Sequence, residues 1–249
     1  MANLEPLIQS IPVAPLKLAS LEGCRTLADQ VNNYLVSFRH ESPTNVGQAD
    51  SLQGYCADSY LLECECPRFG SGEGKGVLKE SVRGCDLFIM VDVTNYSLTY
   101  RVNGYENHMS PDNHYQDLKR IISAADGKAR RINVIMPFLY EGRQHKRSKR
   151  ESLDCALMLQ ELVDMGVSNI LTFDAHDPRV SNSIPLHGFD SFMPTYQFLK
   201  ALVNSVPDFV IDNDHLMIIS PDEGAMGRAV YFSNILGVDM GMFYKRRDY

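Results

Sequence analysis

Residues 169 to 178 read Asn-Ile-Leu-Thr-Phe-Asp-Ala-His-Asp-Pro, an apolar run followed at once by polar, chargeable side chains. The apolar half, residues 169–173, is typical of a buried strand. Asp174, His176 and Asp177 follow, so this strand would carry two carboxylates and an imidazole at its carboxyl end. Ligands of open α/β sheets bind outside the carboxyl ends of the strands, and these side chains can hold a metal or a phosphate-bound metal. The alternative is a loop of helix-capping aspartates with one exposed histidine.

Outward from this tip, strand-like and helix-like segments alternate along the chain. Residues 152–165 have the apolar spacing of an amphipathic helix that ends at Gly166. Residues 86–91 and 132–136 are continuous apolar runs of the buried-strand type. The same reading predicts strands at 16–19, 60–64, 216–220 and 238–244, and helices at 21–38, 113–124 and 224–236. Such alternation predicts a mainly parallel sheet covered by helices.

Two segments interrupt the alternation. Residues 94–111 are polar and rich in Asn and Tyr, which predicts a surface hairpin or loop between a strand and the next helix. The Pro- and Gly-containing stretch 178–194 marks a boundary, so we expect one domain at 1–195 and a second at 196–249. Only about one βαβ unit lies in the second range, too little for an independent core. The second domain is therefore expected to be incomplete.

Composition bounds the class of protein. The chain has 249 residues, 44% of them hydrophobic and 22% charged, as in an ordinary globular protein. It has no apolar run long enough to span a membrane, and its first residues do not resemble a secretory signal. Its net charge of −7 argues against nucleic-acid binding. A zinc site of Cys56, Cys64 and Cys66 is conceivable, but none of the six cysteines forms a Cys-x-x-Cys pair. Reduced thiols in the cytoplasm are the favoured interpretation.

Residues 67–76 read Pro-Arg-Phe-Gly-Ser-Gly-Glu-Gly-Lys-Gly, and their glycines would let the backbone approach a ligand closely. Phe69 could stack on a base, and Glu73 could accept a hydrogen bond from an exocyclic amine. The segment is not a Walker loop, because Gly76 follows Lys75 where Ser or Thr is required. On this segment alone, a flexible surface loop is the favoured interpretation.

Residues 140–150 follow a buried strand and are dense in basic side chains. Such cations would neutralise a polyphosphate, the arginines by bidentate pairing. The alternatives are a solvated basic turn or an RNA-contacting patch at 146–150. Their place at the carboxyl end of a strand favours a small anionic ligand, and the net charge of the chain disfavours RNA.

Two further strand ends carry charge. Asp222 lies between a predicted strand and a predicted helix, where it could hold a metal or a sugar hydroxyl, or simply cap the helix. Lys245, Arg246 and Arg247 follow the last predicted strand. Such a run is usually a solvated terminus, but together with the other segments it could stabilise a transition state rich in phosphate charge.

Five short motifs, in this order from about Lys17 to Arg247, resemble those of the ribose-phosphate diphosphokinases (phosphoribosyl pyrophosphate synthetases). They are Arg68-Phe69-Gly70-Ser71-Gly72-Glu73 for Arg-Phe-x-Asp-Gly-Glu, Arg143-Gln144-His145 for Arg-Gln-Asp, Asp174-Ala175-His176 for Asp-Leu-His, Ser220-Pro221-Asp222-Glu223-Gly224 for Ser-Pro-Asp-x-Gly, and Lys245-Arg246-Arg247. Each motif is weak alone, whereas five in order are a specific signal. The resemblance implies tandem phosphoribosyltransferase-like (type I) α/β domains with mainly parallel sheets flanked by helices, the second domain being incomplete.

The resemblance also implies a function, the transfer of the diphosphoryl group of ATP to the C1 hydroxyl of ribose 5-phosphate, with AMP as the other product. ATP would be bound by Phe69, Ser71, Gly72, Glu73, Arg143 and Gln144. Mg²⁺ would be held by His176, Asp174 and Asp222, and the catalytic cations would be Lys245 and Arg247. Family members are homo-oligomers, commonly hexamers, and inorganic phosphate is a candidate activator. No nucleic acid or membrane is implied as a partner.

The chain departs from the family pattern in several places. Ser71 and His145 replace expected aspartates, Asp177 stands where a small residue is usual, and Gly227 stands where a Lys is common. Ser183 and His187 occupy two positions that are acidic in some relatives. These changes weaken the acidic part of the site, and the 94–111 insertion is also atypical.

The family's ribose-phosphate loop, of the form Asp-Asp-x-x-x-Thr-Gly-Gly-Thr, has no counterpart in this sequence. We expect the chain to be a fragment of a longer enzyme. The alternative is a short, non-catalytic regulatory homologue that assembles with an active synthetase.

Overall fold

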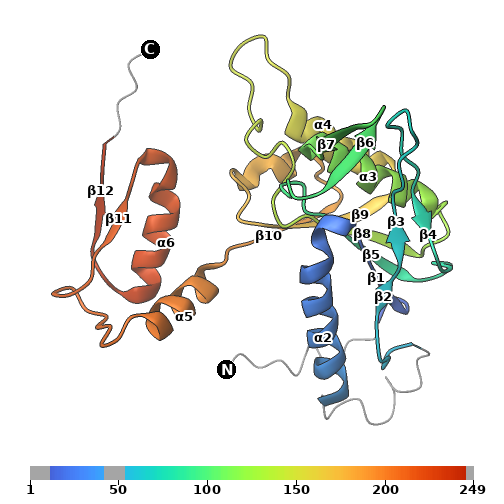
Figure 1. Ribbon diagram of the computed structural model, residues 1–249. Coiled ribbons are helices and arrows are strands. Elements are labelled where there is room, and N and C mark those ends of the chain that lie inside the picture. Colours follow the sequence, from blue (N-terminus) through green and yellow to red (C-terminus); the bar gives the residue numbers. More distant parts are fainter. Residues whose placement is uncertain (1–11, 42–53, 245–249) are drawn as a thin grey trace. The chain divides into compact units, whose positions relative to one another are not determined.

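A computed structural model of the chain describes residues 12–41 and 54–244 (Figure 1). The chain forms two compact units, Met1–Phe192 and Met193–Tyr249. The sequence predicts a domain boundary after residue 195. The division into two phosphoribosyltransferase-like domains at that residue stays a prediction. No helix in the described ranges is long and apolar enough to cross a membrane.

The first unit is built on a six-stranded sheet in the order β10-β9-β8-β5-β1-β2. Every neighbouring pair in it is parallel, which confirms the predicted α/β class. The strands are β1 (Leu16–Ser20), β2 (Leu61–Leu62), β5 (Asp86–Met90), β8 (Arg131–Ile135), β9 (Val167–Phe173) and β10 (Gly188–Phe192). The edge strand β10 is not predicted by the sequence.

Helices cover both faces of this sheet. They are α2 (Arg25–Glu41), preceded by a 3-10 turn at Glu22–Cys24, α3 (Pro111–Ala124) and α4 (Asp154–Asp164). Successive residues of β5 face opposite ways: Leu87 and Ile89 pack in one core with α3 and α4, while Met90 packs in a second core with α2. The strand is buried on both faces, which is why its residues 87–90 form a continuous apolar run.

Local signals set the helix ends. Ser110 accepts a hydrogen bond from the backbone N–H of Asn113 at 3.2 Å, and Pro111 occupies the first turn of α3. Gly166 follows α4 with a φ of +91°, so it is the predicted helix stop. The helix predicted at 152–165 begins two residues late, at Asp154.

Two antiparallel hairpins project from the sheet. The segment predicted as one strand at 60–64 divides instead into β2 and β3 (Cys64–Glu65), and β3 pairs with β4 (Val77–Leu78). The second hairpin is formed by β6 (Thr99–Val102) and β7 (Tyr105–His108), which confirms a hairpin in the 94–111 insertion. Its turn has positive φ angles at Asn103 and Gly104, the residue pair that tight hairpins favour.

A ladder of hydrogen-bonded polar side chains lies near the amino ends of strands β5, β8 and β9. Asn133 donates to Oδ1 of Asp86 at 2.7 Å, and Asn169 donates to Oδ1 of Asn133 at 2.6 Å. Arg131 pairs with the same Asp86 carboxylate. Gly188 lies opposite Asn169 in the β9–β10 register, and a Cβ at Gly188 would overlap the Asn169 side-chain oxygen. The ladder therefore links β5, β8 and β9 through hydrogen bonds that satisfy buried polar groups.

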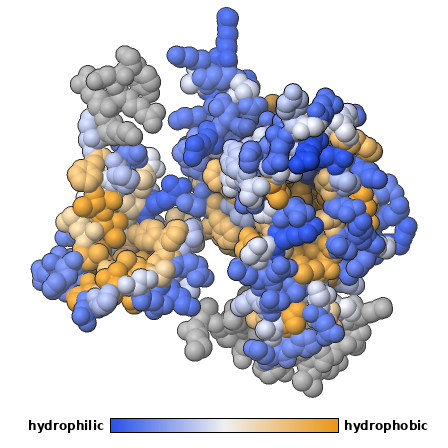
Figure 2. Space-filling model, in the orientation of Figure 1, coloured by the Kyte–Doolittle hydropathy of each residue, from blue (hydrophilic) through white to orange (hydrophobic). Residues whose placement is uncertain are grey.

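The second unit contains α5 (Thr195–Ser205), β11 (Ile218–Ser220), α6 (Met226–Leu236) and β12 (Met240–Met242). β11 and β12 are parallel, and α6 ends at Gly237 with a φ of +67°, as predicted. The last strand is shorter than the predicted 238–244, and α5 is not predicted. Many apolar side chains of this unit are exposed (Figure 2). They include Tyr196, Phe198, Val203, Ile219, Tyr231 and Phe243.

Candidate functional site

Two of the predicted motifs of the first unit, Arg143–His145 and Asp174–His176, meet at the carboxyl ends of β8 and β9. These strands are parallel neighbours, so the segments that follow them share one edge of the sheet. The segment after β8 leads to Arg143 and His145, and the segment after β9 carries Asp174 and His176. The imidazole rings of His145 and His176 lie with their centroids 5.0 Å apart, edge to face. Two of the five motifs are therefore in direct contact.

Asp174 occupies an unusual backbone conformation. Its φ is +46°, in the left-handed region that costs energy for any residue except glycine, although aspartate tolerates it better than most. The turn is held from the neighbouring strand: the Asp174 N–H donates to the Phe192 carbonyl at 3.0 Å, and the Ala175 N–H donates to Ser191 Oγ at 3.0 Å. A strained residue that is held by hydrogen bonds at a strand tip is a feature found often at ligand sites.

Asp177 serves the local structure of the same loop. Its carboxylate accepts from the Arg179 N–H and so begins the 3-10 helix η3 (Pro178–Ser183). The Arg179 guanidinium hydrogen-bonds the carboxylate and holds the pKa of Asp177 well below its usual range. Nε2 of His145 lies 3.6 Å from Oδ2 of Asp177. The assignment of Asp177 to the loop itself is confirmed, and its charge faces the motif that comes from β8.

Gln144 braces the basic segment against helix α4. Its side-chain N–H donates to the Ser152 carbonyl at 2.6 Å, and its backbone carbonyl accepts from the Cys155 backbone N–H at 3.3 Å. A contact between this amide and ATP stays a prediction. Arg143 is exposed, as are the basic side chains at 146, 147, 149 and 150. The edge that holds His176 is thus flanked by an accessible cationic loop.

The predicted nucleotide loop forms the tip between β3 and β4. The Phe69 N–H donates to the Glu73 carbonyl at 2.7 Å, and the Ser71 hydroxyl donates to the Glu73 carboxylate at 2.8 Å. Gly72 has a φ of +91°, and a Cβ there would lie 2.9 Å from Cγ2 of Val102, so only glycine suits this position. Phe69 is 54% exposed. Among the described residues, no hydrogen bond or ring contact joins this loop to His176.

Arg68 anchors the root of that loop to helix α3. Its guanidinium makes two hydrogen bonds to the Asp117 carboxylate, at 2.7 and 2.8 Å. Arg120 donates to the same carboxylate at 2.6 Å. The sequence gives no sign of this cluster, because Asp117 is 49 residues from Arg68.

Asp222 lies in the second unit and caps a 3-10 helix, η4 (Glu223–Ala225). Its Oδ1 accepts from the Ala225 N–H at 3.1 Å, which confirms the capping interpretation, while a metal role stays a prediction. Lys245 and Arg247, the predicted catalytic cations, lie outside the described residues.

Groups of three or more His, Cys, Asp or Glu side chains placed to hold a metal ion are absent from residues 12–41 and 54–244. Cys56, Cys64 and Cys66 lie in these ranges, so the structure does not form the zinc site that the sequence left open. Instead, the Cys64 thiol donates to the Ser20 carbonyl at 3.1 Å. Burial raises the pKa of Cys64 to about 11 and that of Cys66 to about 12, so both are thiols at neutral pH.

The sheet also has a switch point, between β1 and β5, where successive strands add on opposite sides. A cavity of about 430 Å³ lies there, lined by the segments that follow β1, β5 and β8. Asp92, Thr94 and Phe138 are among its lining residues. Sequence reasoning did not select these residues, although a switch point is where ligands commonly bind in such sheets.

Comparison with known proteins supplies the family. Residues 16–166 match the sequence family described as the N-terminal domain of ribose phosphate pyrophosphokinase. The ribose-phosphate pyrophosphokinase of Staphylococcus epidermidis is 28% identical over 191 residues, which cover 75% of this chain and 53% of that protein. The protein of the same name from Oceanobacillus iheyensis is 26% identical over 190 residues, with the same coverage. This chain thus spans about half the length of these relatives.

A solved structure shares the fold. The crystal structure of phosphoribosylpyrophosphate synthetase from Mycobacterium smegmatis matches with a TM-score of 0.71 and 22% sequence identity. The match covers 94% of this chain and 65% of that chain.

Proposed function

Because this chain belongs to the family of the N-terminal domain of ribose phosphate pyrophosphokinase, we propose that its protein is an ATP-dependent ribose-phosphate diphosphokinase. The C1 hydroxyl oxygen of ribose 5-phosphate attacks the β-phosphorus of ATP, and the bond from that phosphorus to the bridging oxygen on the α side breaks. The products are 5-phosphoribosyl diphosphate, AMP and the released hydroxyl proton. The observation that carries the proposal is the contact between the Arg143–His145 and Asp174–His176 motifs at one sheet edge.

The geometry supports binding of a triphosphate at this edge. Arg143 and the exposed basic residues after it offer charge to phosphate oxygens, and arginine can pair with them bidentately. Phosphoryl-type transfer depends mainly on positioning and charge neutralisation, so an accessible cationic loop beside the strand tips is the feature that this chemistry requires.

The proposal places Mg²⁺ at the tip of β9. Asp174 and His176 would be its protein ligands, and a sparse set suffices because Mg²⁺ keeps several waters and binds substrate phosphates. The ion would neutralise the charge on the transferring group. Asp222 remains a candidate ligand on the ribose-phosphate side, and Lys245 and Arg247 remain candidates for stabilising the transition state.

The exposed ring of Phe69 is proposed to stack on the adenine base, and Glu73 to accept from its amine. No described contact joins this loop to His176 in one chain, so the proposal includes a homo-oligomer, commonly a hexamer in the family, in which the loop serves a neighbouring site. The cysteines are reduced, which fits a reducing compartment, and we propose the cytoplasm.

The test is AMP formation from ATP and ribose 5-phosphate by the full-length protein, with Mg²⁺ and inorganic phosphate present. Arg143→Ala and His176→Ala should each lower kcat/KM by about 100-fold or more, because each removes charge stabilisation or metal support at the reacting phosphates. Lys128→Ala is the control, since Lys128 is an exposed cation paired with Asp126 away from this edge. Absence of AMP from the full-length protein would refute the enzymatic proposal.

A second candidate, a non-catalytic regulatory homologue, is favoured by one observation. Ser71, which replaces an expected aspartate, donates its hydroxyl to Glu73 and thereby occupies the carboxylate proposed to bind adenine. For such a protein, a purified homo-oligomer would be inactive, and a mixed oligomer with an active homologue would be recovered from cells. Activity of the full-length protein alone would exclude this role.

A further inference from the structure

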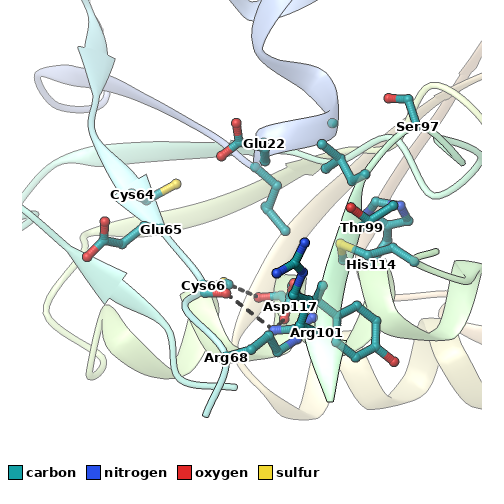
Figure 3. Close-up of a pocket in the computed structure, with 15 residues that line it drawn as sticks. Glu22, Cys64, Glu65, Cys66, Arg68, Ser97, Thr99, Arg101, His114 and Asp117 are labelled. Atoms are coloured by element: carbon teal, nitrogen blue, oxygen red, sulfur yellow. Dashed lines mark hydrogen bonds and ion pairs between the residues drawn. The ribbon is translucent and has the colours of Figure 1, made fainter. Parts of the chain in front are cut away.

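A second cavity, of about 630 Å³, lies in the first unit under the β6–β7 hairpin (Figure 3). It is bounded by the turn after β1, by β3 and the residues that follow it, by β6 and by helix α3. Figure 3 shows Cys64 and Glu65 on one side and Thr99 and His114 on the opposite side. The volume falls in the range of small-molecule sites. We call this cavity the hairpin pocket.

The floor of the hairpin pocket is a buried, cationic cluster. The Arg68 and Asp117 side chains are 10% and 5% exposed, and Arg120 shares the Asp117 carboxylate. Two guanidinium groups against one carboxylate leave one positive charge in excess. The acidic residues of the wall do not offset it, because Glu22 pairs with Arg25 and Glu65 pairs with Lys79.

Arg101 adds a further positive charge at the wall. It lies on β6, lines the pocket, and forms no salt bridge with any residue in the described ranges, including Glu106 directly opposite it in the hairpin. A guanidinium in this position offers a fork of N–H donors to a carboxylate or phosphate. The charge of the pocket therefore selects an anion.

His114 specifies a second feature of the ligand. His114 lies on α3 and lines the pocket, and only 2% of the residue is exposed. Nε2 lies 2.6 Å from the Asn95 carbonyl oxygen, which can only accept, so Nε2 donates, and in the neutral ring Nδ1 is an acceptor. No described residue donates to Nδ1. Nδ1 is not among the buried side-chain atoms that lack a partner, so it is open to solvent, and a ligand hydroxyl would replace water there.

We propose that the hairpin pocket binds a small hydroxylated organic anion, either a phosphate monoester or a carboxylate. Arg101 and the Arg68 guanidinium would receive the anionic group, and Nδ1 of His114 would accept from a hydroxyl. Tyr100, which lies with its ring 5.4 Å from Arg68 Cζ, would cover the apolar part of the ligand together with Leu98 and Met109. The residues that line this pocket include none from the segments that follow β8 and β9, and the inference does not depend on the proposed diphosphokinase activity.

Calorimetric titration of the full-length protein with three related probes tests the proposal. Glucose 6-phosphate carries a phosphate, gluconate carries a carboxylate, and glucose carries neither. At least one of the two anions should bind saturably at millimolar concentration or below, and glucose should not. The anion that binds identifies the head group that the site prefers.

Two variants assign the binding to this pocket. Arg101→Gln removes an exposed charge and should weaken binding of the anion by about tenfold or more, since charged hydrogen bonds are among the strong ones. His114→Phe should weaken it as well, and circular dichroism would show whether that variant folds. Lys128→Gln, a matched loss of charge elsewhere, should bind as the wild type does.

The outcomes separate this site from the ATP edge. Binding of Mg²⁺-ATP should be unchanged in Arg101→Gln, because Arg101 does not belong to the ATP-binding motifs. The proposal is overturned if neither anion binds saturably, or if Arg101→Gln binds the anion as tightly as the wild type.

Discussion

Arg68, three residues after strand β3, forms a bidentate ion pair with Asp117 in the middle of helix α3. The two hydrogen bonds are 2.7 and 2.8 Å long, and both side chains are nearly buried. The same carboxylate holds Arg120. The pair fixes the root of the Phe69–Glu73 loop and forms the floor of the hairpin pocket.

Replacing Asp117 with Ala should destabilise the first unit. The change leaves two buried guanidinium groups without their shared carboxylate. Breaking a buried ion pair in this way lowers the free energy of unfolding by about 3 kcal/mol. Urea denaturation followed by circular dichroism measures the effect. Glu80→Ala is the control, because its pair with Lys17 is exposed and should contribute less than about 1 kcal/mol. Equal effects of the two substitutions would contradict a structural role for the cluster.

Tyr115 should make the fold sensitive to alkali. Burial, and a hydrogen bond of 2.7 Å to Glu161, raise the pKa of Tyr115 well above its usual value. The folded chain therefore keeps the proton at pH values where the unfolded tyrosine, with a pKa of about 10, loses it. Its contribution is complete below about pH 10 and declines above, at up to about 1.4 kcal/mol per pH unit.

Urea unfolding between pH 8 and 11 measures that slope. Tyr115→Phe should flatten the decline relative to the wild type, because phenylalanine has no proton to lose. Tyr105→Phe, at a position 77% exposed on the hairpin, should leave the slope unchanged. Identical slopes in all three proteins would show that Tyr115 is not linked to stability.

The thiols should react very unequally. Cys56 is exposed, whereas Cys24, Cys64 and Cys155 are buried. Burial raises the pKa of Cys24 to about 12 and that of Cys155 to about 11, so their reactive thiolate form is scarce at pH 8. Titration with a disulfide reagent should show a fast phase that Cys56→Ser removes, and all six thiols should react in urea. Fast modification of Cys64 in the native protein would contradict the burial seen here.

Gly188 should not tolerate a side chain. A Cβ there would overlap Oδ1 of Asn169, and forcing a methyl group into a packed site costs about 1 to 3 kcal/mol. Gly188→Ala should lower the free energy of unfolding by that amount in urea. Gly70→Ala is the control, since nothing lies within 4 Å of a Cβ at that position. Combining Gly188→Ala with Asn169→Ala should cost less than the sum of the single changes.

The sequence predicts two kinds of feature well. One is local structure, in which the contacting residues are close in the chain, and the other is a strand whose burial follows from its place in a parallel sheet. Residues 86–91 and 132–136 are apolar apart from Asp86 and Asn133, because their strands are covered on both faces. The turn at Asn103 and Gly104 is a local signal. By contrast, β3 and β4 have two residues each, too few for any periodicity, and β10 is an edge strand of mixed exposure.

The candidate site divides in the same way. That Arg143 and His176 would share an edge follows from parallel pairing of consecutive strands, and the contact of the His145 and His176 rings confirms it. The Arg68–Asp117 pair and the orientation of His114 depend on tertiary packing between distant segments, which no pattern in the sequence reports. From the sequence, helix capping by Asp222 is one alternative beside binding of a metal or a sugar hydroxyl. The assignments of Phe69, Ser71, Gly72, Glu73, Gln144 and the metal ligands to ATP and Mg²⁺ stay predictions.

The strand order of the sheet bears on how the first unit is assembled as it is synthesised. β1 is made first, β2 joins one of its edges and β5 the other, and β8, β9 and β10 then follow outward on the β5 side in turn. No strand has to be inserted between two that are already paired. Chains emerge from the ribosome amino end first, so each new strand of this sheet finds an unpaired strand edge as it emerges. The loop that carries Arg143 and the strand tip that carries His176 come together only near the end of this order of assembly.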